Sequence, residues 1–277
     1  MEIIIAKYAG FCFGVKRALE LVEAAQARHS GTVATLGEII HNPQVVEQLR
    51  KAGVRTVESP RELKAGTLVI SCHGVGPGIR EAAKKSRLKV VDATCPFVDR
   101  AQKLVKQLAS EGYDIVIFGD RGHREVKGLM GYAGDKAKII QEVAEAEELP
   151  FSQKLGVVVQ TTQEIGLYSE LLAILGRKCQ ELRAFNTICG ATRQRQEVAV
   201  ELAQKVDLML VVGGRNSANT RRLAEVCAAV GVKVKHIETA SEIVSNWLRG
   251  RKRIGITAGA STPQWVIDDV AARLKKR

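Results

Sequence analysis

The sequence lacks several features that would assign a function at once. It contains six cysteines but no CxxC pair, which disfavours a zinc ribbon, a thioredoxin-like motif and an ordinary ferredoxin. It has neither a GxGxxG loop nor a GxxxxGK[ST] loop, so nucleotide binding has no support. Aromatic residues make up only 4%, which leaves few side chains to stack on single-stranded nucleic acid. Any metal site must therefore be assembled from distant parts of the chain.

Long hydrophobic runs are also missing. None approaches the roughly 18–20 residues of a membrane-spanning helix. The N-terminal MEIIIA has no basic start and no small-residue cleavage site, so we expect no signal peptide and a cytoplasmic location with reduced thiols. The 277 residues are 45% hydrophobic and 26% charged, an ordinary globular mixture. The net charge of +12, with basic clusters at 84–89 and 249–253, fits either an anionic partner or a solvated surface.

Short apolar runs alternate with helical patterns along the whole chain. This alternation is typical of βα units and predicts an α/β fold with parallel sheets. The clearest helical patterns cover residues 97–110, 168–178, 195–205 and 263–276. The predicted strands are EIIIA (2–6), TVATLG (32–37), TLVIS (67–71), LKVVDA (88–93), DIVIFG (114–119), AKII (137–140), KLGVVVQ (154–160), LMLVVGG (208–214) and RIGITAG (253–259).

A weak internal repeat appears when three of the cysteines are aligned. Cys12, Cys95 and Cys189 each lie between a strand-like segment, which for Cys189 is LRAFNTI (182–188), and a predicted helix, and they are separated by 83 and 94 residues. No linker-like composition marks the boundaries, so we expect three closely packed lobes. The predicted lobes are residues 1–93, 94–185 and 186–277.

Further polar residues repeat at matching positions after each cysteine. If the cysteine is counted as the first position of each repeat, the second position lies 28 or 29 residues after it. The third position follows the next predicted strand. Ligands bind beyond the carboxyl ends of strands in open parallel sheets, so these positions predict one shared site. They are His41, His123 and Ser217 for the second position, and His73, Thr161 or Thr162, and Ser261 for the third.

The three aligned cysteines suit a metal centre. Three thiolates could hold an iron–sulfur cluster that keeps one iron without a protein ligand, or a catalytic zinc with an open fourth position. Helix N-termini would stabilise the negative charge of a cluster. The remaining cysteines lack the repeat context and are interpreted as packing residues: Cys72, Cys179 and Cys227.

One acid stands out beside these positions. Glu125 follows His123 by two residues in GHREVKG, and a carboxyl group in a closed pocket can donate protons near neutral pH. The alternative is an ordinary acid at a helix start. Imidazoles, hydroxyls and amides at the other positions would suit a diphosphate. His29 and His236 lack this context and are interpreted as structural.

Nine motifs in order resemble the LytB family, and they cover residues 1–270. The resemblance implies an iron–sulfur enzyme with three pseudo-repeated lobes, built on small, mainly parallel sheets around a central cluster. It implies reduction of 4-hydroxy-3-methylbut-2-enyl diphosphate to isopentenyl and dimethylallyl diphosphate, with loss of the hydroxyl group as water. The motifs are AGFCFGVKRAL, GEIIHNPQVV, SCHGVGP, DATCPFV, GHREVKG, QTT, FNTIC followed by AT and RQ, NSAN, and TAGASTP.

The resemblance also implies roles for individual residues. Cys12, Cys95 and Cys189 match the ligands of a [4Fe-4S] cluster. Glu125 matches a proton-relay acid, with Thr161 or Thr162 beside it. Ala218 replaces a second serine found in many relatives, which removes one hydroxyl contact to the diphosphate. The diphosphate-binding positions are His41, His73, His123, Ser217, Ala218, Asn219 and Ser261.

The expected partners are a diphosphate substrate and a ferredoxin or flavodoxin that supplies electrons, with no nucleic acid, no membrane and a monomeric chain. Two other functions stay open from the residues alone. The basic charge would suit a non-enzymatic iron–sulfur sensor or a nucleic-acid-binding protein, which should bind with strong salt dependence. The three cysteines would also suit a zinc hydrolase, which metal analysis would distinguish.

Overall fold

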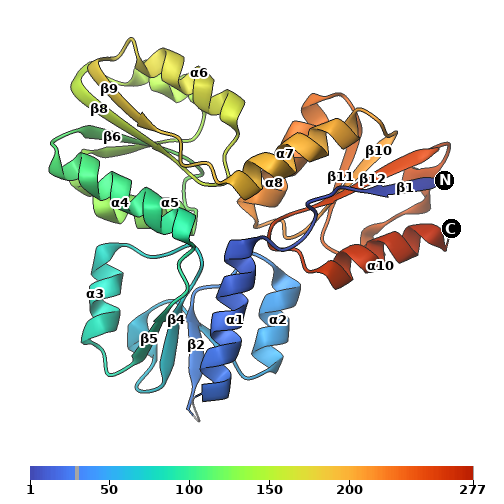
Figure 1. Ribbon diagram of the computed structural model, residues 1–277, viewed down its shortest axis with the longest axis horizontal. Coiled ribbons are helices and arrows are strands. Elements are labelled where there is room, and N and C mark those ends of the chain that lie inside the picture. The colour runs from blue at the N-terminus through green and yellow to red at the C-terminus, as the bar shows by residue number, and fades with distance from the viewer. Residues whose placement is uncertain (29–30, 277) are drawn as a thin grey trace. The chain divides into compact units, whose positions relative to one another are not determined.

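The computed structural model describes residues 1–28 and 31–276, so His29 lies outside the described residues. The described strands form three four-stranded parallel sheets with helices packed against them (Figure 1), and the predicted small parallel sheets are confirmed. The strands are β1 (Glu2–Ile5), β2 (Val33–Leu36), β3 (Arg55–Val57), β4 (Thr67–Ile70), β5 (Lys89–Asp92), β6 (Asp114–Phe118), β7 (Ala137–Ile140), β8 (Ser152–Val159), β9 (Cys179–Phe185), β10 (Leu208–Val212), β11 (Lys233–Ile237) and β12 (Arg253–Ala258).

Helices connect most consecutive strands, as parallel pairing requires. The α-helices are α1 (Phe13–Arg28), α2 (Pro43–Lys51), α3 (Pro77–Lys85), α4 (Pro96–Ser110), α5 (Arg124–Ala133), α6 (Ile165–Leu175), α7 (Gly190–Ala203), α8 (Ala218–Ala229), α9 (Ser245–Leu248) and α10 (Gln264–Lys275). Short 3₁₀ turns are η1 (Pro60–Glu62), η2 (Gly134–Lys136), η3 (Val143–Glu148) and η4 (Ala240–Glu242).

The three sheets share one strand order. The orders are β3-β2-β4-β5, β7-β6-β8-β9 and β11-β10-β12-β1. In each sheet the last strand of this order lies at an edge and leads directly into a cysteine turn: β5 into Cys95, β9 into Cys189 and β1 into Cys12. The internal repeat seen in the sequence is therefore a repeat of whole sheets.

Strand β1 belongs to the sheet formed by the C-terminal part of the chain. It pairs in parallel with β12, so that Glu2 lies opposite Arg253 and Ile5 opposite Ile256. The strands before Cys95 and Cys189 each complete the sheet of the repeat that comes before the cysteine in the sequence. The strand before Cys12, which is β1, completes the sheet of the last repeat. The division into lobes at 93 and 185 stays a prediction; residues 1–93 supply strands to two different sheets.

Side-chain alternation along the strands builds a core on both faces of each sheet. In β6, Ile115 and Ile117 pack with buried residues of α4 and α5, whereas Val116 and Phe118 pack with buried residues of α6. In β10, Leu208 and Leu210 face the cluster that contains α10 residues. Burial on both faces explains why these strands read as continuous apolar runs in the sequence.

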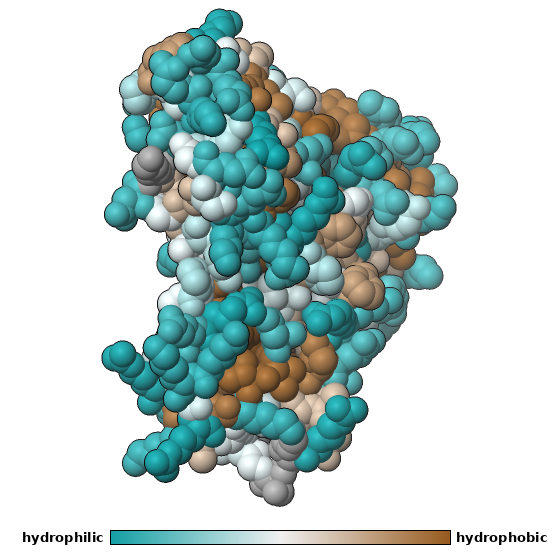
Figure 2. All heavy atoms as spheres, turned by 60° about the vertical axis from the view of Figure 1, so that its left-hand side comes forward, coloured by the Kyte–Doolittle hydropathy of each residue, from teal (hydrophilic) through white to brown (hydrophobic). Residues whose placement is uncertain are grey.

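The chain separates into two compact units. The first comprises Met1–Val15, His41–Val45 and Gly190–Arg277, and it holds the sheet that contains β1. The second comprises Lys16–Ile40 and Val46–Cys189, and it holds the other two sheets. Hydrophilic side chains cover most of the face shown in Figure 2. No helix among the described residues is long and apolar enough to cross a membrane.

Candidate active site

A buried carboxyl group lies at the start of α5. Glu125 is only 2% exposed. One of its oxygens accepts the Thr161 N–H at 2.7 Å, and the other accepts the Thr161 hydroxyl at 2.8 Å. Thr161 follows the carboxyl end of β8, so the strand end and the helix start position the pair together. Both residues belong to the second compact unit.

The surroundings of Glu125 prepare it to exchange a proton near neutral pH. Burial raises the pKa of Glu125 from its ordinary 4.5 to about 7, because a charged carboxylate is poorly solvated there. The two hydrogen bonds from Thr161 act in the opposite direction, since they stabilise the charged form, and Asp120 adds a smaller upward contribution. A general acid needs a pKa close to the working pH, and Glu125 meets this requirement.

The two candidate threonines have different surroundings. Thr161 is buried and contacts Glu125, whereas the Thr162 hydroxyl accepts a hydrogen bond from the Gln160 side chain at 2.9 Å. The Gln160 side-chain oxygen in turn accepts the Asp120 N–H at 2.7 Å. Gln160 belongs to the QTT motif but was not among the predicted site residues. Its position directly after a buried strand and before two threonines could have indicated that it lies beside the site residues.

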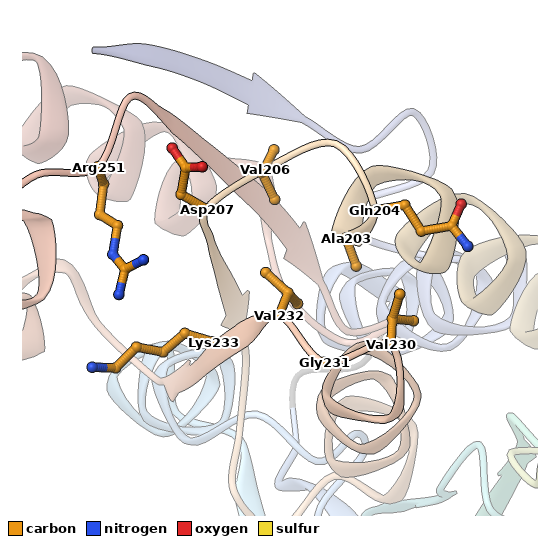
Figure 3. A pocket seen from close by; sticks show the side chains of 9 residues that line it. All are labelled: Ala203, Gln204, Val206, Asp207, Val230, Gly231, Val232, Lys233 and Arg251. Carbon is orange, nitrogen blue, oxygen red and sulfur yellow. The ribbon is translucent and has the colours of Figure 1, made fainter.

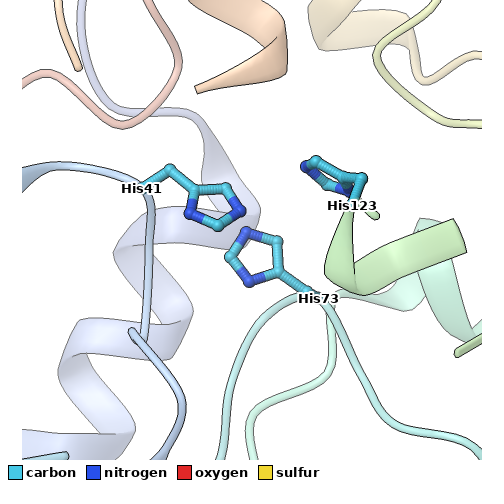
Figure 4. A group of neighbouring side chains, drawn as sticks. All are labelled: His41, His73 and His123. Carbon is cyan, nitrogen blue, oxygen red and sulfur yellow. The ribbon is translucent and has the colours of Figure 1, made fainter. Parts of the chain in front are cut away.

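Two of the predicted histidines lie close together in the second compact unit. His123 caps α5, and its Nδ1 accepts the Glu125 N–H at 3.2 Å. The His73 and His123 rings meet edge to face with centroids 5.6 Å apart. Figure 4 draws both rings, His73 from the loop after β4 and His123 from the start of α5. His41 belongs to the first unit, where its carbonyl oxygen accepts the Ser261 hydroxyl at 2.9 Å.

The other predicted diphosphate-binding residues gather at the carboxyl ends of β10 and β12. Ser217 caps α8, and its hydroxyl accepts the Thr220 N–H at 3.3 Å. Ala218 is the first residue of that helix. The Asn219 side-chain oxygen accepts the Ala260 N–H at 2.9 Å, which joins the start of α8 to the loop that carries Ser261. Strand ends and a helix N-terminus thus present polar groups together, as expected for an anion site.

The three cysteine turns are held in the same way. The Cys95 N–H donates to the Cys72 carbonyl at 3.0 Å, next to His73. The Cys189 N–H donates to the Thr161 carbonyl at 3.0 Å. The Cys12 N–H donates to the Ala260 carbonyl at 3.1 Å, next to Ser261. Each predicted cysteine ligand is therefore fixed to the loop that carries a predicted third-position residue.

The cysteine side chains fit an anionic metal cluster. None of the three forms a disulfide, and all three are half-buried. Each is followed at once by a long helix, α1, α4 or α7, whose positive N-terminal end favours a thiolate. Cys95 makes no side-chain capping bond to α4. Thiolates on turns at helix starts are the donors that iron–sulfur clusters use, so these residues fit such a group.

Arg17 was not among the predicted site residues. Its guanidinium donates to the Thr94 carbonyl at 3.1 Å, in the residue just before Cys95. The Asp92 side chain accepts from the Thr94 N–H at 3.0 Å and also from the Thr94 hydroxyl. The turn that carries Cys95 is therefore held from both sides. The basic residue early in α1 was the only signal for this contact in the sequence.

An open hollow lies at the opposite ends of the strands from Ser217. Figure 3 shows it at the amino ends of β10 and β11, where Asp207, Lys233 and Arg251 supply its charges. The Asp207 carboxylate accepts the N–H groups of Lys252 and Arg253, each at 2.8 Å, which fixes the start of β12. These bonds lower the pKa of Asp207. Asp207 therefore has a structural role, and no predicted site residue lines the hollow.

The chain is similar to known proteins over nearly its whole length. Residues 3–275 match the LytB protein family. A protein from Pelobacter propionicus named 4-hydroxy-3-methylbut-2-enyl diphosphate reductase is 49% identical over 274 residues, which cover 99% of this chain and 98% of the relative. A protein of the same name from Geobacter sulfurreducens is 48% identical over 276 residues, which cover 100% and 98%.

Two solved structures are also similar. The E-1-hydroxy-2-methyl-but-2-enyl-4-diphosphate reductase from Plasmodium falciparum has a TM-score of 0.94 and 30% identity, covering 99% of this chain and 88% of that one. An (E)-4-hydroxy-3-methyl-but-2-enyl diphosphate reductase, described as the terminal enzyme of the non-mevalonate pathway, has a TM-score of 0.70 and 43% identity, with both chains fully covered. With its family match and these full-length relatives, the chain belongs to the LytB family of reductases.

Proposed function

We propose that the chain reduces 4-hydroxy-3-methylbut-2-enyl diphosphate to isopentenyl and dimethylallyl diphosphate. The observation that carries the proposal is the buried pair of Glu125 and Thr161, a proton donor with a pKa of about 7 at the end of a parallel strand. Near-identical length and 49% identity with a relative of that name support the choice of substrate.

A [4Fe-4S] cluster is the cofactor that we propose, with Cys12, Cys95 and Cys189 as its ligands. Support comes from their equivalent turns, each at the N-terminus of a helix and each held by a backbone bond to a neighbouring loop. When bound, the cluster would supply electrons and a Lewis-acid iron without a protein ligand. The electrons would come from a separate ferredoxin or flavodoxin.

The diphosphate would be held by neutral donors. His41, His73, His123, Ser217, Asn219 and Ser261 are the side chains proposed for this role. Ala218 has no hydroxyl, so only its backbone N–H can contribute. Because that N–H lies in the first turn of α8, it has no partner within the helix and is available to an anion. We therefore expect Ala218 to weaken binding relative to serine without abolishing it.

Glu125 would deliver a proton to the departing hydroxyl group. In the overall reaction the carbon–oxygen bond breaks, two electrons and two protons are consumed, and the oxygen leaves as water. Thr161 would orient the Glu125 carboxyl group through its hydroxyl and N–H contacts. After each turnover Glu125 would regain its proton from solvent, which a pKa of about 7 permits.

The test is iron and sulfide analysis of anaerobically purified protein, combined with turnover using a reduced viologen as electron donor. Cys95→Ser should lose most of the iron and the activity. Cys179→Ser is a matched control, because Cys179 is also half-buried but lies at the start of β9, where its thiol donates to the Leu175 carbonyl at 3.3 Å. Full activity in Cys95→Ser, or zinc in place of iron and sulfide, would contradict the proposal.

A further inference from the structure

One ion pair joins the start of α5 to a neighbouring sheet. The Arg124 Nη2 group donates to both carboxylate oxygens of Glu58, each at 2.8 Å. Glu58 directly follows β3, in the sheet β3-β2-β4-β5, whereas α5 follows β6, in the sheet β7-β6-β8-β9. Both residues belong to the second compact unit. The contact therefore connects two sheets whose loops carry different predicted site residues.

A glycine provides the space for this contact. Gly37 follows β2 with a φ of +69°, and a Cβ added there would clash with the Arg124 guanidinium. The Gly37 N–H donates to the Val57 carbonyl at 2.7 Å, in the residue before Glu58. The guanidinium therefore lies at the carboxyl ends of β2 and β3, beside the strand β4 that leads to His73.

Packing holds α5 at its other end. A Cβ on Gly131, in the last turn of α5, would lie 3.0 Å from the Gly76 Cα, so this turn lies close to the start of α3. At the first turn, Arg124 makes the connection through Glu58. Two separated contacts thus set the direction of α5 relative to the sheet β3-β2-β4-β5.

The first turn of α5 carries two predicted site residues, one on either side of Arg124. Glu125 is bonded to Thr161, which follows β8 of its own sheet. His123 instead meets His73 of the neighbouring sheet edge to face (Figure 4). Movement of this turn away from the neighbouring sheet would separate the two imidazoles, whereas Glu125 would keep its contacts with Thr161.

We propose that Arg124 is a positioning residue that keeps His123 beside His73, where both imidazoles can bind one diphosphate group. The inference rests on the proposed function, which assigns both histidines to the diphosphate. The side chains of Arg124 and Glu58 are 33% and 70% exposed, and ion pairs with such exposure add little to folding stability. The contact should therefore leave the fold intact and change substrate affinity by no more than its own interaction energy allows.

Removal of either partner tests this role. Arg124→Gln and Glu58→Gln should each raise the KM for the substrate about three- to fivefold, the range that an exposed ion pair permits. The kcat should stay within about twofold of the wild type, because Glu125 keeps its contacts. The two substitutions change the net charge in opposite directions, so a shared rise cannot come from long-range attraction of the diphosphate. The double variant should be no worse than either single variant.

Arg121→Gln is the matched control. Arg121 lies three residues before Arg124, and its Nη1 donates to Glu145 at 3.1 Å, in the turn between β7 and β8 of its own sheet. The KM of this variant should match the wild type, because the pair does not join two sheets.

A charge-swapped variant tests the contact itself. Glu58→Arg with Arg124→Glu keeps an ion pair at this corner and should return the KM to within about twofold of the wild type. Calorimetric titration of the holoenzyme with inorganic diphosphate should rank all the variants in the same order without turnover.

Unchanged KM and diphosphate affinity in Arg124→Gln would overturn the role of Arg124. So would additive losses in the double variant, or equal losses in Arg121→Gln and Arg124→Gln. A charge-swapped variant as weak as the single variants would also contradict it. Absent viologen-driven turnover in the wild type would instead contradict the proposed function.

Discussion

At the scale of single residues, Glu125 combines a chemical role with a cost in stability. Its carboxyl group is buried, and Thr161 donates one hydrogen bond to each of its two oxygens. Two donors reduce the penalty of burying the charged form but do not remove it, as the raised pKa indicates. The same group should therefore control turnover and also the pH dependence of folding.

Replacing Glu125 by glutamine should separate binding from proton transfer. Glu125→Gln keeps the shape and can still contact Thr161, but it cannot donate a proton as an acid does. We expect kcat to fall about a hundredfold or more, with substrate affinity nearly unchanged. Steady-state turnover and direct substrate titration would check this. A variant that turns over at the wild-type rate would remove Glu125 from the relay.

The raised pKa of Glu125 also predicts how stability depends on pH. The folded state binds this proton up to about pH 7, whereas the unfolded state releases it near pH 4.5. The contribution of Glu125 to the free energy of unfolding is thus fully present below pH 4.5 and is lost as the pH rises to about 7. The total loss is roughly 3 kcal/mol. Denaturant unfolding of the apoprotein between these limits should show a flatter pH profile for Glu125→Gln. Identical profiles for both proteins would contradict the assigned pKa.

At the scale of strands and helices, apolar runs predicted every fully buried strand but missed some of the strands at the sheet edges. Strands β6, β8, β10 and β12 were identified because burial on both faces leaves continuous apolar runs. The edge strands β3 and β11 were not predicted, because their charged and polar residues interrupt the apolar run. The sheet to which β1 belongs was also unpredictable, because a strand's own sequence does not identify its partner.

The candidate site was predictable at the same scale only in part. Aligned cysteine turns indicated which loops carry site residues. The choice between Thr161 and Thr162 depended on side-chain direction after β8, which no pattern in the sequence contained. The Arg17 contact to Thr94 joins residues 77 positions apart, so local spacing could not indicate it.

One turn offers a clear test of backbone geometry. Gly66 precedes β4 with a φ of +119°, and a Cβ there would lie 2.3 Å from the Thr32 carbonyl oxygen. Gly66→Ala should therefore combine backbone strain with a steric clash and cost about 2 kcal/mol or more. Gly112→Ala is the control, because Gly112 has a φ of +83° and open space around it. Urea unfolding should rank Gly66→Ala clearly below Gly112→Ala; equal midpoints would mean that the clash relaxes freely.

At the scale of the whole molecule, the three repeats should act as one cofactor site. If Cys12, Cys95 and Cys189 bind a single cluster, then losing one ligand should have nearly the same effect as losing two. We expect the single variant Cys12→Ser and the double variant Cys12→Ser with Cys189→Ser to have similarly low iron contents. Iron and sulfide analysis after anaerobic reconstitution would check this. Graded losses, one share of the iron for each cysteine, would indicate separate metal sites.

The pairing of β1 with β12 has a consequence for how the protein is made. Glu2 pairs with Arg253, which is synthesised about 250 residues later. The Cys12 turn must wait as well, since its N–H bonds to the Ala260 carbonyl. Domains generally fold as their sequence emerges, but this edge cannot close until residues 253–260 have been synthesised. Cofactor loading should therefore begin only after Ala260 has been synthesised, and translation products that stop before it should remain without iron.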